Sequence, residues 1–209
     1  MTEKNVSAPD YWEAAYREKR DGWELGEPTP PIVRALAGSP AKGRALVLGA
    51  GRGHEARAAA KAGWSVVGVD FAPSARAEAE RLTPPELAGR ITWRVADLFD
   101  LAGTDAGAFD LVLEHTTFCA IDPARRDEWM RVVSAVLRPG GTLLGLFYTH
   151  GREGGPPYGA THDAVLRALE RAGFELLSSE VPADSVERRR GDELLVTAVS
   201  GLRPTGASR

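Results

Sequence analysis

From residue 44 onward, short apolar runs alternate with longer amphipathic stretches, and few folds accommodate this order. The first apolar run is ALVL at 45–48, and a helical stretch follows it to residue 62. Further strands are predicted at 65–69, 91–95, 109–113 and 142–147, with helices at 73–82 and 123–137. Parallel strands need such crossovers, so the alternation predicts a doubly wound α/β domain with a mainly parallel sheet covered on both faces.

The end of the chain departs from this alternation. A helix at 161–172 is followed by the strand-like runs FELLSSEV at 174–181 and LLVTAVS at 194–200. The charged segment ERRRGDE between them, with its arginines at 188–190, is typical of a tight, solvated hairpin turn. We therefore expect these two strands to form a closing antiparallel hairpin.

The first 40 residues are predicted to form a cover on this core. Residues 9–20 carry aromatic side chains at helical spacing, including Trp12 and Tyr16, and predict a lid-like helix. The following DGWELGEPTPPI is rich in glycine and proline and predicts a loop that contains Trp23. One domain over 1–209 is expected: a lid helix and loop at 1–40, an α/β core at 41–202 and a polar tail at 203–209.

Net charge and cysteine content limit the partners and the compartment. Lys and Arg number 26 against 29 Asp and Glu, and the net charge of -3 gives no basic field for nucleic acid. The single Cys119 can form neither an intramolecular disulfide nor a zinc cluster, so we expect no metal site and a cytoplasmic location. No apolar stretch reaches the roughly 18 to 20 residues that cross a bilayer, so no membrane partner is expected. The oligomeric state stays open.

The run ALVL leads directly into a turn with glycines at 49, 51 and 53, and a helix follows. Glycine allows a sharp turn and the close approach of a ligand, and the helix N-terminus offers free N–H groups. A dinucleotide fingerprint would place its third glycine or alanine at 54, where this chain has His54. The spacing therefore favours a nucleoside-containing cofactor other than a nicotinamide dinucleotide.

Acidic residues follow the next two strands of the predicted sheet. Asp70 ends the second strand, from where its carboxylate can accept both hydroxyl hydrogen bonds of a ribose. Asp97 follows the third strand and can accept a hydrogen bond from an adenine amino group, with Phe71 and Leu98 on either side of the ring. The alternative is that both aspartates only cap turns. Ligands bind at this edge of the sheet, which favours the cofactor role.

Four stretches together resemble the thiopurine methyltransferase-like family, and within it the plant-type thiol and halide methyltransferases. They are WELGEPTPP at 23–31, LVLGAGRGHEA at 46–56, FDLVLEHTTFCAI at 109–121 and EGGPPY at 153–158. The resemblance implies a class I, Rossmann-like methyltransferase fold, with a mainly parallel seven-stranded sheet whose last strand runs antiparallel. It also implies S-adenosyl-L-methionine as cofactor and a small-molecule substrate. Glu24 and Leu48 depart from the family's Asp and Pro, and Glu-His-Thr at 114–116 replaces Asp-Tyr-Thr.

The resemblance also implies a role for each candidate residue. The cofactor-binding set would be Trp23, Gly49, Gly51, Gly53, Asp70, Phe71, Asp97, Leu98 and Glu114. In this set the glycines line the methionine part, Asp70 holds the ribose, Asp97 with Leu98 holds the adenine, and Glu114 lies beside the sulfonium. The set at the acceptor and the lid would be Trp12, Trp23, Phe118, Tyr148 and Tyr158.

Methyl transfer from a sulfonium is an in-line displacement, so the site must align the reactants and exclude water. A soft anion needs no general base, and thiols, sulfide, halides, thiocyanate and metalloid oxyanions stay open as acceptors. His115 can serve a neutral thiol as proton acceptor, although histidine at a strand end more often packs or forms hydrogen bonds. Cys119 is predicted to be a small core residue without a catalytic role.

Two alternatives to a methyltransferase remain at this point. One is a protein that binds S-adenosylmethionine without catalysis, and the other is a nicotinamide-dependent oxidoreductase. The glycine spacing disfavours the second, as does the lack of a convincing Tyr-x-x-x-Lys or similar hydride-transfer set.

Overall fold

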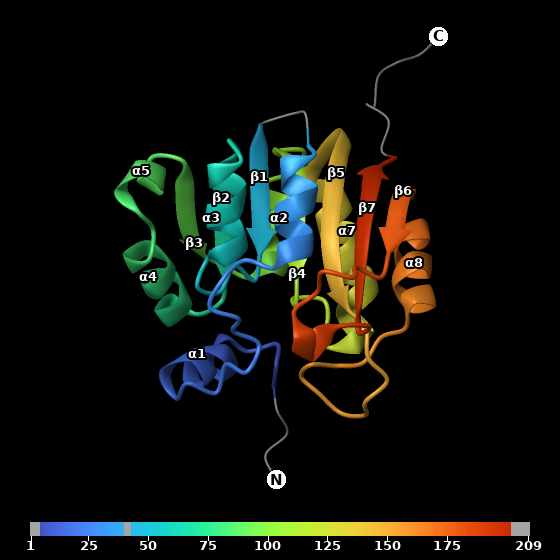
Figure 1. Cartoon of the computed structure of the whole chain (residues 1–209), viewed down its shortest axis with the longest axis horizontal. Helices are drawn as coiled ribbons and strands as arrows, with labels where there is room; N and C mark the ends of the chain where they lie inside the picture. Colours follow the sequence, from blue (N-terminus) through green and yellow to red (C-terminus); the bar gives the residue numbers. More distant parts are fainter. Residues whose placement is uncertain (1–4, 40–42, 202–209) are drawn as a thin grey trace.

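The computed structural model describes residues 5–39 and 43–201 and contains a seven-stranded sheet in the order β3-β2-β1-β4-β5-β7-β6 (Figure 1). The strands are β1 (Arg44–Leu48), β2 (Ser65–Asp70), β3 (Ile91–Val95), β4 (Phe109–His115), β5 (Leu137–Tyr148), β6 (Phe174–Glu180) and β7 (Glu193–Ser200). The first five strands run parallel, while β7 runs antiparallel to both β5 and β6. The predicted doubly wound sheet with an antiparallel last strand is confirmed.

Helices cover both faces of this sheet. One face carries α2 (Pro30–Ala37), α3 (His54–Lys61) and α5 (Pro85–Ala88), and the other carries α6 (Leu101–Thr104), α7 (Arg126–Val136) and α8 (His162–Arg171). Further helices are α1 (Pro9–Arg17), α4 (Pro73–Arg81), η1 (Leu98–Asp100), η2 (Pro123–Arg125) and η3 (Glu187–Arg189). In Figure 1, α2 and α3 lie in front of the sheet and α7 lies behind it.

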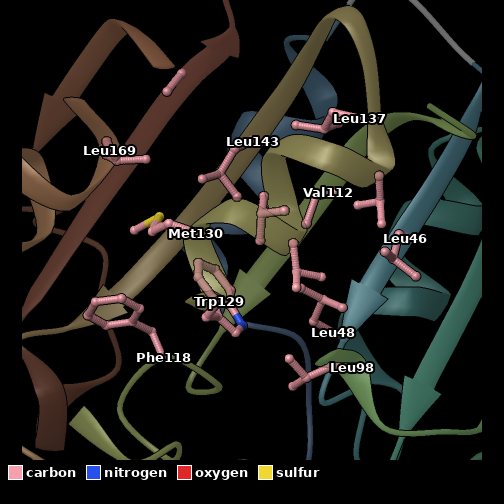
Figure 2. Packing of buried hydrophobic residues seen from close by; sticks show 14 of the residues in the cluster. Leu46, Leu48, Leu98, Val112, Phe118, Trp129, Met130, Leu137, Leu143 and Leu169 are labelled. Atoms are coloured by element: carbon pink, nitrogen blue, oxygen red, sulfur yellow. The ribbon is translucent and has the colours of Figure 1, made fainter. Parts of the chain in front are cut away.

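The larger hydrophobic core lies between the sheet and α7. Figure 2 shows Trp129 and Met130 of this helix beside Leu143 of β5 and Val112 of β4, and all four side chains are fully buried. Burying one such side chain stabilises the fold by about 1.5–3 kcal/mol. This packing holds the central strands whose carboxyl ends carry the candidate site.

Two helices differ from the prediction at the N-terminus. The segment 30–37 is the helix α2, whereas a loop was predicted as far as residue 32. Its two leading prolines occupy the first turn, where a missing N–H costs no hydrogen bond, and Ile32 and Leu36 are buried against the sheet. The lid helix α1 ends at Arg17 and not at residue 20, and Lys19 has a positive φ of 53°. The predicted tail at 203–209 lies outside the described residues.

The two C-terminal strands form the predicted hairpin, but their connection is not a tight turn. β6 ends at Glu180 and β7 begins at Glu193, and the intervening segment contains η3. It returns to the edge of the sheet where the parallel strands end, and Arg188 there donates to the carbonyl oxygen of Glu24 at 2.8 Å. The prediction of a solvated turn is wrong for Arg189, which is 5% exposed.

The helix α1 lies beside the carboxyl edge of the parallel strands, toward which the arrow of β1 points in Figure 1. The carboxylate of Glu13 anchors this helix to α4 by accepting from the amide and the hydroxyl of Ser74 at 2.9 and 2.6 Å. Among the helices of the described residues, none has the length and apolarity that crossing a membrane requires.

Candidate active site

The glycine turn between β1 and α3 has a backbone that other residues adopt only with strain. Gly49, Gly51 and Gly53 have φ values of 54°, 53° and 79°. A Cβ on Gly49 would lie 2.5 Å from the hydroxyl oxygen of Thr117, and one on Gly53 would lie 2.2 Å from the ring of Trp93. Glycine is therefore required here both by conformation and by close packing.

Asp70 leaves the sheet beside this turn because Leu48 of β1 pairs with Val69 of β2. Its carboxylate accepts one hydrogen bond from the amide of Gly51 and one from that of Ala72, each at 2.9 Å. Burial raises the pKa of Asp70, and the backbone donors act against that rise. A carboxylate offers about four acceptor positions, so further positions remain for two ligand hydroxyl groups.

A cavity of about 500 Å³ opens between this edge and the N-terminal cover. Its walls combine the ends of the parallel strands with residues from α1, from the segment after it and from the connection before β7. The lining residues are Val6, Ser7, Tyr11, Trp12, Tyr16, Arg20, Gly22, Trp23, Gly49, Val69, Asp70, Phe71, Ala96, Leu98, Phe99, Thr116, Thr117, Cys119, Ala120, Ile121, Asp122, Arg125, Tyr148, Pro156, Pro157, Arg188 and Arg189.

Aromatic side chains form the N-terminal wall of this cavity. Trp23 makes edge contacts with Trp12 and with Tyr16, each with ring centroids 5.6 Å apart. The indole N–H of Trp12 donates to the carbonyl oxygen of Val6 at 2.8 Å. Burial raises the pKa of Tyr16 well above its usual value, and the nearby Asp70 carboxylate adds to the rise. Tyr16 is therefore a neutral donor beside the glycine turn.

The segment after α1 is tied to the core by Glu24. Its carboxylate contacts Nε2 of His54 at 2.7 Å and a guanidinium nitrogen of Arg52 at 3.1 Å. Burial by itself raises the pKa of Glu24, but hydrogen bonds from His54, Gly26 and Arg52 outweigh it and lower the pKa to about 2. These contacts fix the backbone that carries Trp23 over the cavity.

Arg189 also lines the cavity and is a candidate site residue that the sequence prediction missed. Its guanidinium donates to the carbonyl oxygen of Trp23 and contacts Nε2 of His115, each at 2.8 Å. It also lies 3.5 Å from the carboxylate of Glu193 and 5.3 Å from the ring centroid of Tyr148. The spacing of Arg189 and Glu193, four residues apart, was the available signal, but their distant partners were not visible in the sequence.

The predicted residues separate into those that line the cavity and those that lie behind its wall. Trp12, Trp23, Gly49, Asp70, Phe71, Leu98 and Tyr148 line it. Gly51, Gly53, Asp97, Glu114, Phe118 and Tyr158 are not among its lining residues. Asp97 instead accepts from the amide of Phe99 at 2.8 Å, which is the capping role considered as the alternative.

Glu114 and Phe118 are parts of the core next to the cavity. Glu114 is fully buried and accepts from the amide of Phe118 at 2.9 Å, and burial raises the pKa of its carboxyl to about 7. The ring of Phe118 packs against Trp129 and Phe147, with centroids 5.5 and 5.3 Å away. Neither side chain is among the lining residues of the cavity.

Cys119 lines the cavity but is poorly suited to act as a nucleophile. Its thiol donates to the carbonyl oxygen of Thr116 at 3.2 Å. Burial raises the pKa of Cys119 to about 12, and the nearby Glu114 adds to the rise. The thiol is therefore neutral at physiological pH.

Comparison with known proteins identifies the kind of site. Residues 7–201 match the family described as thiopurine S-methyltransferase (TPMT). The chain belongs to this family. It is 34% identical over 187 residues to thiocyanate methyltransferase 1 of Arabidopsis thaliana, covering 88% of this chain and 82% of that protein. It is also 35% identical over 188 residues to the probable thiol methyltransferase 2 of the same plant, with the same coverage.

Solved structures agree with this family in fold. The 1,6-didemethyltoxoflavin-N1-methyltransferase of Burkholderia thailandensis, solved with its substrate and S-adenosylhomocysteine, superposes with a TM-score of 0.72 at 22% identity. The superposition covers 93% of this chain and 87% of that chain. Membership of the thiopurine S-methyltransferase family, with this fold, makes the chain an S-adenosylmethionine-dependent methyltransferase, as predicted, and removes the nicotinamide alternative.

The residues of the site fit the cofactor of this family. The buried carboxylate of Asp70 keeps acceptor positions for two ribose hydroxyls, and the glycine turn exposes backbone to the same cavity at Gly49. The volume of about 500 Å³ lies within the range of about 300–1,000 Å³ that is usual for ligand pockets.

Proposed function

We propose that this methyltransferase acts on a small, soft and anionic acceptor: a thiolate, hydrosulfide, thiocyanate, a halide or a metalloid oxyanion. The arginines of the cavity lining carry the proposal. Among the residues that the structure describes, the lining contains four arginines, at 20, 125, 188 and 189, and two aspartates, Asp70 and Asp122, but no histidine, lysine or glutamate. Three of these arginines also pair with carboxylates outside the lining, at Glu18, Glu128 and Glu193. The proposal therefore rests on their guanidinium groups, which attract anions and donate hydrogen bonds to them, more than on net charge.

The same lining offers no obvious general base for a neutral acceptor. His115 is not among the lining residues and the Cys119 thiol holds its proton. Of the two lining carboxylates, Asp70 is assigned to the ribose, and Asp122 accepts from the amide of Ala124 at 2.8 Å. S-adenosylmethionine, when bound, supplies an electrophilic methyl group on a sulfonium. An acceptor that already carries its negative charge can attack without losing a proton, so alignment and exclusion of water are sufficient.

We assign the residues of the site as follows. Asp70 holds the ribose, Phe71 and Leu98 enclose the adenine, and the turn at 49–53 receives the methionine part. Trp12 and Trp23 exclude water, while Tyr148 and Arg189 contact the acceptor. Glu114, Phe118 and Tyr158 support the wall from behind and do not touch the reactants.

The names of two relatives support this acceptor class, since one is a thiocyanate methyltransferase and the other a probable thiol methyltransferase. We also propose a cytoplasmic location, because the single cysteine cannot form an intramolecular disulfide. The acceptor is the expected partner, and neither nucleic acid nor a membrane is part of the proposal.

Two measurements test the proposal. S-adenosylhomocysteine binding is measured by titration calorimetry in the wild type and in Asp70→Ala, with Asp163→Ala at the exposed start of α8 as the control. Loss of two ribose hydrogen bonds to a charged group predicts a fall in affinity of roughly 100-fold in Asp70→Ala alone. Headspace analysis then compares thiocyanate, iodide and hydrosulfide with a neutral amine. Methylation of the amine and of none of the anions would refute the acceptor class.

A further inference from the structure

Behind the cavity wall, four charged or titratable side chains from four elements meet in a buried cluster. They are Glu55 of α3, His115 at the end of β4, Arg189 of η3 and Glu193 of β7. Their side chains are 12%, 11%, 6% and 0% exposed. Of these four, only Arg189 lines the cavity.

The hydrogen-bond partners determine the state of the His115 ring. Arginine has only donors, so the Nε2 atom that lies 2.8 Å from Nη1 of Arg189 must accept and carries no hydrogen. The single hydrogen of the neutral ring is then on Nδ1, which lies 3.1 Å from the carboxylate of Glu55. Glu55 itself accepts from the amide of Thr29 at 3.2 Å. The ring therefore links a fixed carboxylate to a cavity arginine.

Arg189 retains donors for a ligand after these contacts. Its Nη1 atom serves His115 and Glu193, and its Nη2 atom serves the carbonyl oxygen of Trp23. The contacts among the described residues thus use three of the five guanidinium N–H groups. The rest of the group lies next to the ring of Tyr148 on the cavity wall.

We propose that His115 is a positioning residue that holds the Arg189 guanidinium toward the acceptor anion. This inference rests on the proposed function, in which Arg189 contacts the acceptor. The Nε2 atom of His115 supplies the acceptor that fixes one arm of the guanidinium in this role. The charged groups facing the ring are Glu55 of α3, Glu114 of β4, Arg189 of η3 and Glu193 of β7.

Two substitutions separate the two ring nitrogens. His115→Gln can present an oxygen near the place of Nε2, and so keeps an acceptor for Arg189. His115→Asn places its amide near Nδ1, and so keeps a partner for Glu55 but leaves Arg189 without its acceptor. Both variants are neutral and polar, which makes them matched controls for each other. His162→Asn, at the start of α8, controls for histidine loss elsewhere.

The first readout is thiocyanate binding to the S-adenosylhomocysteine complex by calorimetry, which requires no turnover. Loss of a hydrogen bond that orients a charged group predicts roughly tenfold weaker binding in His115→Asn and less than about threefold in His115→Gln. The same variants should raise KM for thiocyanate by those factors with little change in kcat. S-adenosylhomocysteine affinity should stay within error of the wild type in both variants, which shows that each is folded.

The difference between the two variants supplies a readout that a purely structural role would not change, because both substitutions remove the same ring and only His115→Gln keeps an acceptor for Arg189. Equal losses in the two variants, or no loss in His115→Asn, would overturn the inference and leave the proposed function intact. No thiocyanate binding to the wild-type complex would overturn both.

Discussion

The two halves of the cavity are built by different means. The side of β1, β2 and β3, here called the cofactor half, is formed by the backbone of the turn at 49–53 and by the Asp70 carboxylate, which backbone amides hold. The side of β4, β5 and β7, here called the acceptor half, depends on long side chains that bridge distant segments, as Arg189 does between Trp23 and His115. Few substitutions are therefore compatible with the backbone of the cofactor half, whereas side-chain substitutions can change the chemistry of the acceptor half.

The largest effect is expected at the glycine turn. Gly49→Ala places a Cβ 2.5 Å from the Thr117 hydroxyl oxygen at a φ of 54°. Overpacking and backbone strain together predict a loss of about 3–4 kcal/mol in the free energy of unfolding, with a collapse of cofactor affinity. Urea denaturation and calorimetry with S-adenosylhomocysteine measure both quantities.

A matched control exists in Gly107→Ala. Gly107 has a similar φ of 64° but nothing within 4 Å of an added Cβ, so only the backbone strain of about 1 kcal/mol is expected. Equal destabilisation by Gly49→Ala and Gly107→Ala would show that close packing around the turn adds nothing to the backbone strain.

The next effect tests the acceptor half. Arg189→Met leaves the fully buried Glu193 without its guanidinium partner and should cost about 3 kcal/mol of unfolding free energy. Thiocyanate affinity should also fall, while S-adenosylhomocysteine affinity should change little. The control is Arg190→Met, at an exposed residue that does not line the cavity, and it should change the free energy of unfolding by about 0.5 kcal/mol or less.

Adding Glu193→Gln to Arg189→Met should recover part of the lost stability, because the second change removes the unpaired buried carboxylate. Failure of the double variant to recover would indicate that Arg189 supports the fold mainly through the Trp23 carbonyl. If Arg189→Met weakened S-adenosylhomocysteine binding as much as thiocyanate binding, the cofactor half and the acceptor half would not be independent.

The last effect is confined to stability and concerns the buried carboxyl group of Glu114, in the core next to the cavity. The pKa of Glu114 is raised by burial from 4.5 to about 7, so folding favours its protonated form. The resulting stability is complete below pH 4.5 and is lost as the pH rises through about 7. A pH series of urea midpoints should show a loss of about 3 kcal/mol in the wild type that is missing in Glu114→Gln. The exposed Glu86→Gln should keep the wild-type profile, and an unchanged profile in Glu114→Gln would contradict the raised pKa.

Sequence patterns predicted the sheet well because each strand carries its own local signal. Apolar runs with helices between them indicate parallel order whatever their neighbours are, and the glycine turn follows directly from the first run. Asp70 and Gly49 were found for this reason, since each sits at a strand end that the pattern itself defines. The helix α2 was missed because its leading prolines were interpreted as breaking regular structure, although they suit a first helical turn.

The chain by itself therefore determined the doubly wound fold, the cofactor turn and the family, because these depend on periodicity and on short motifs. Only the tertiary structure decided which side chains reach the cavity. It places Glu114 and Phe118 in the core. It also places Arg189, from the charged run at 188–190, in contact with Trp23, which is 166 residues away in the sequence. Contacts of this length leave no periodic trace in a sequence, because they depend on where the folded strands place the ends of distant loops.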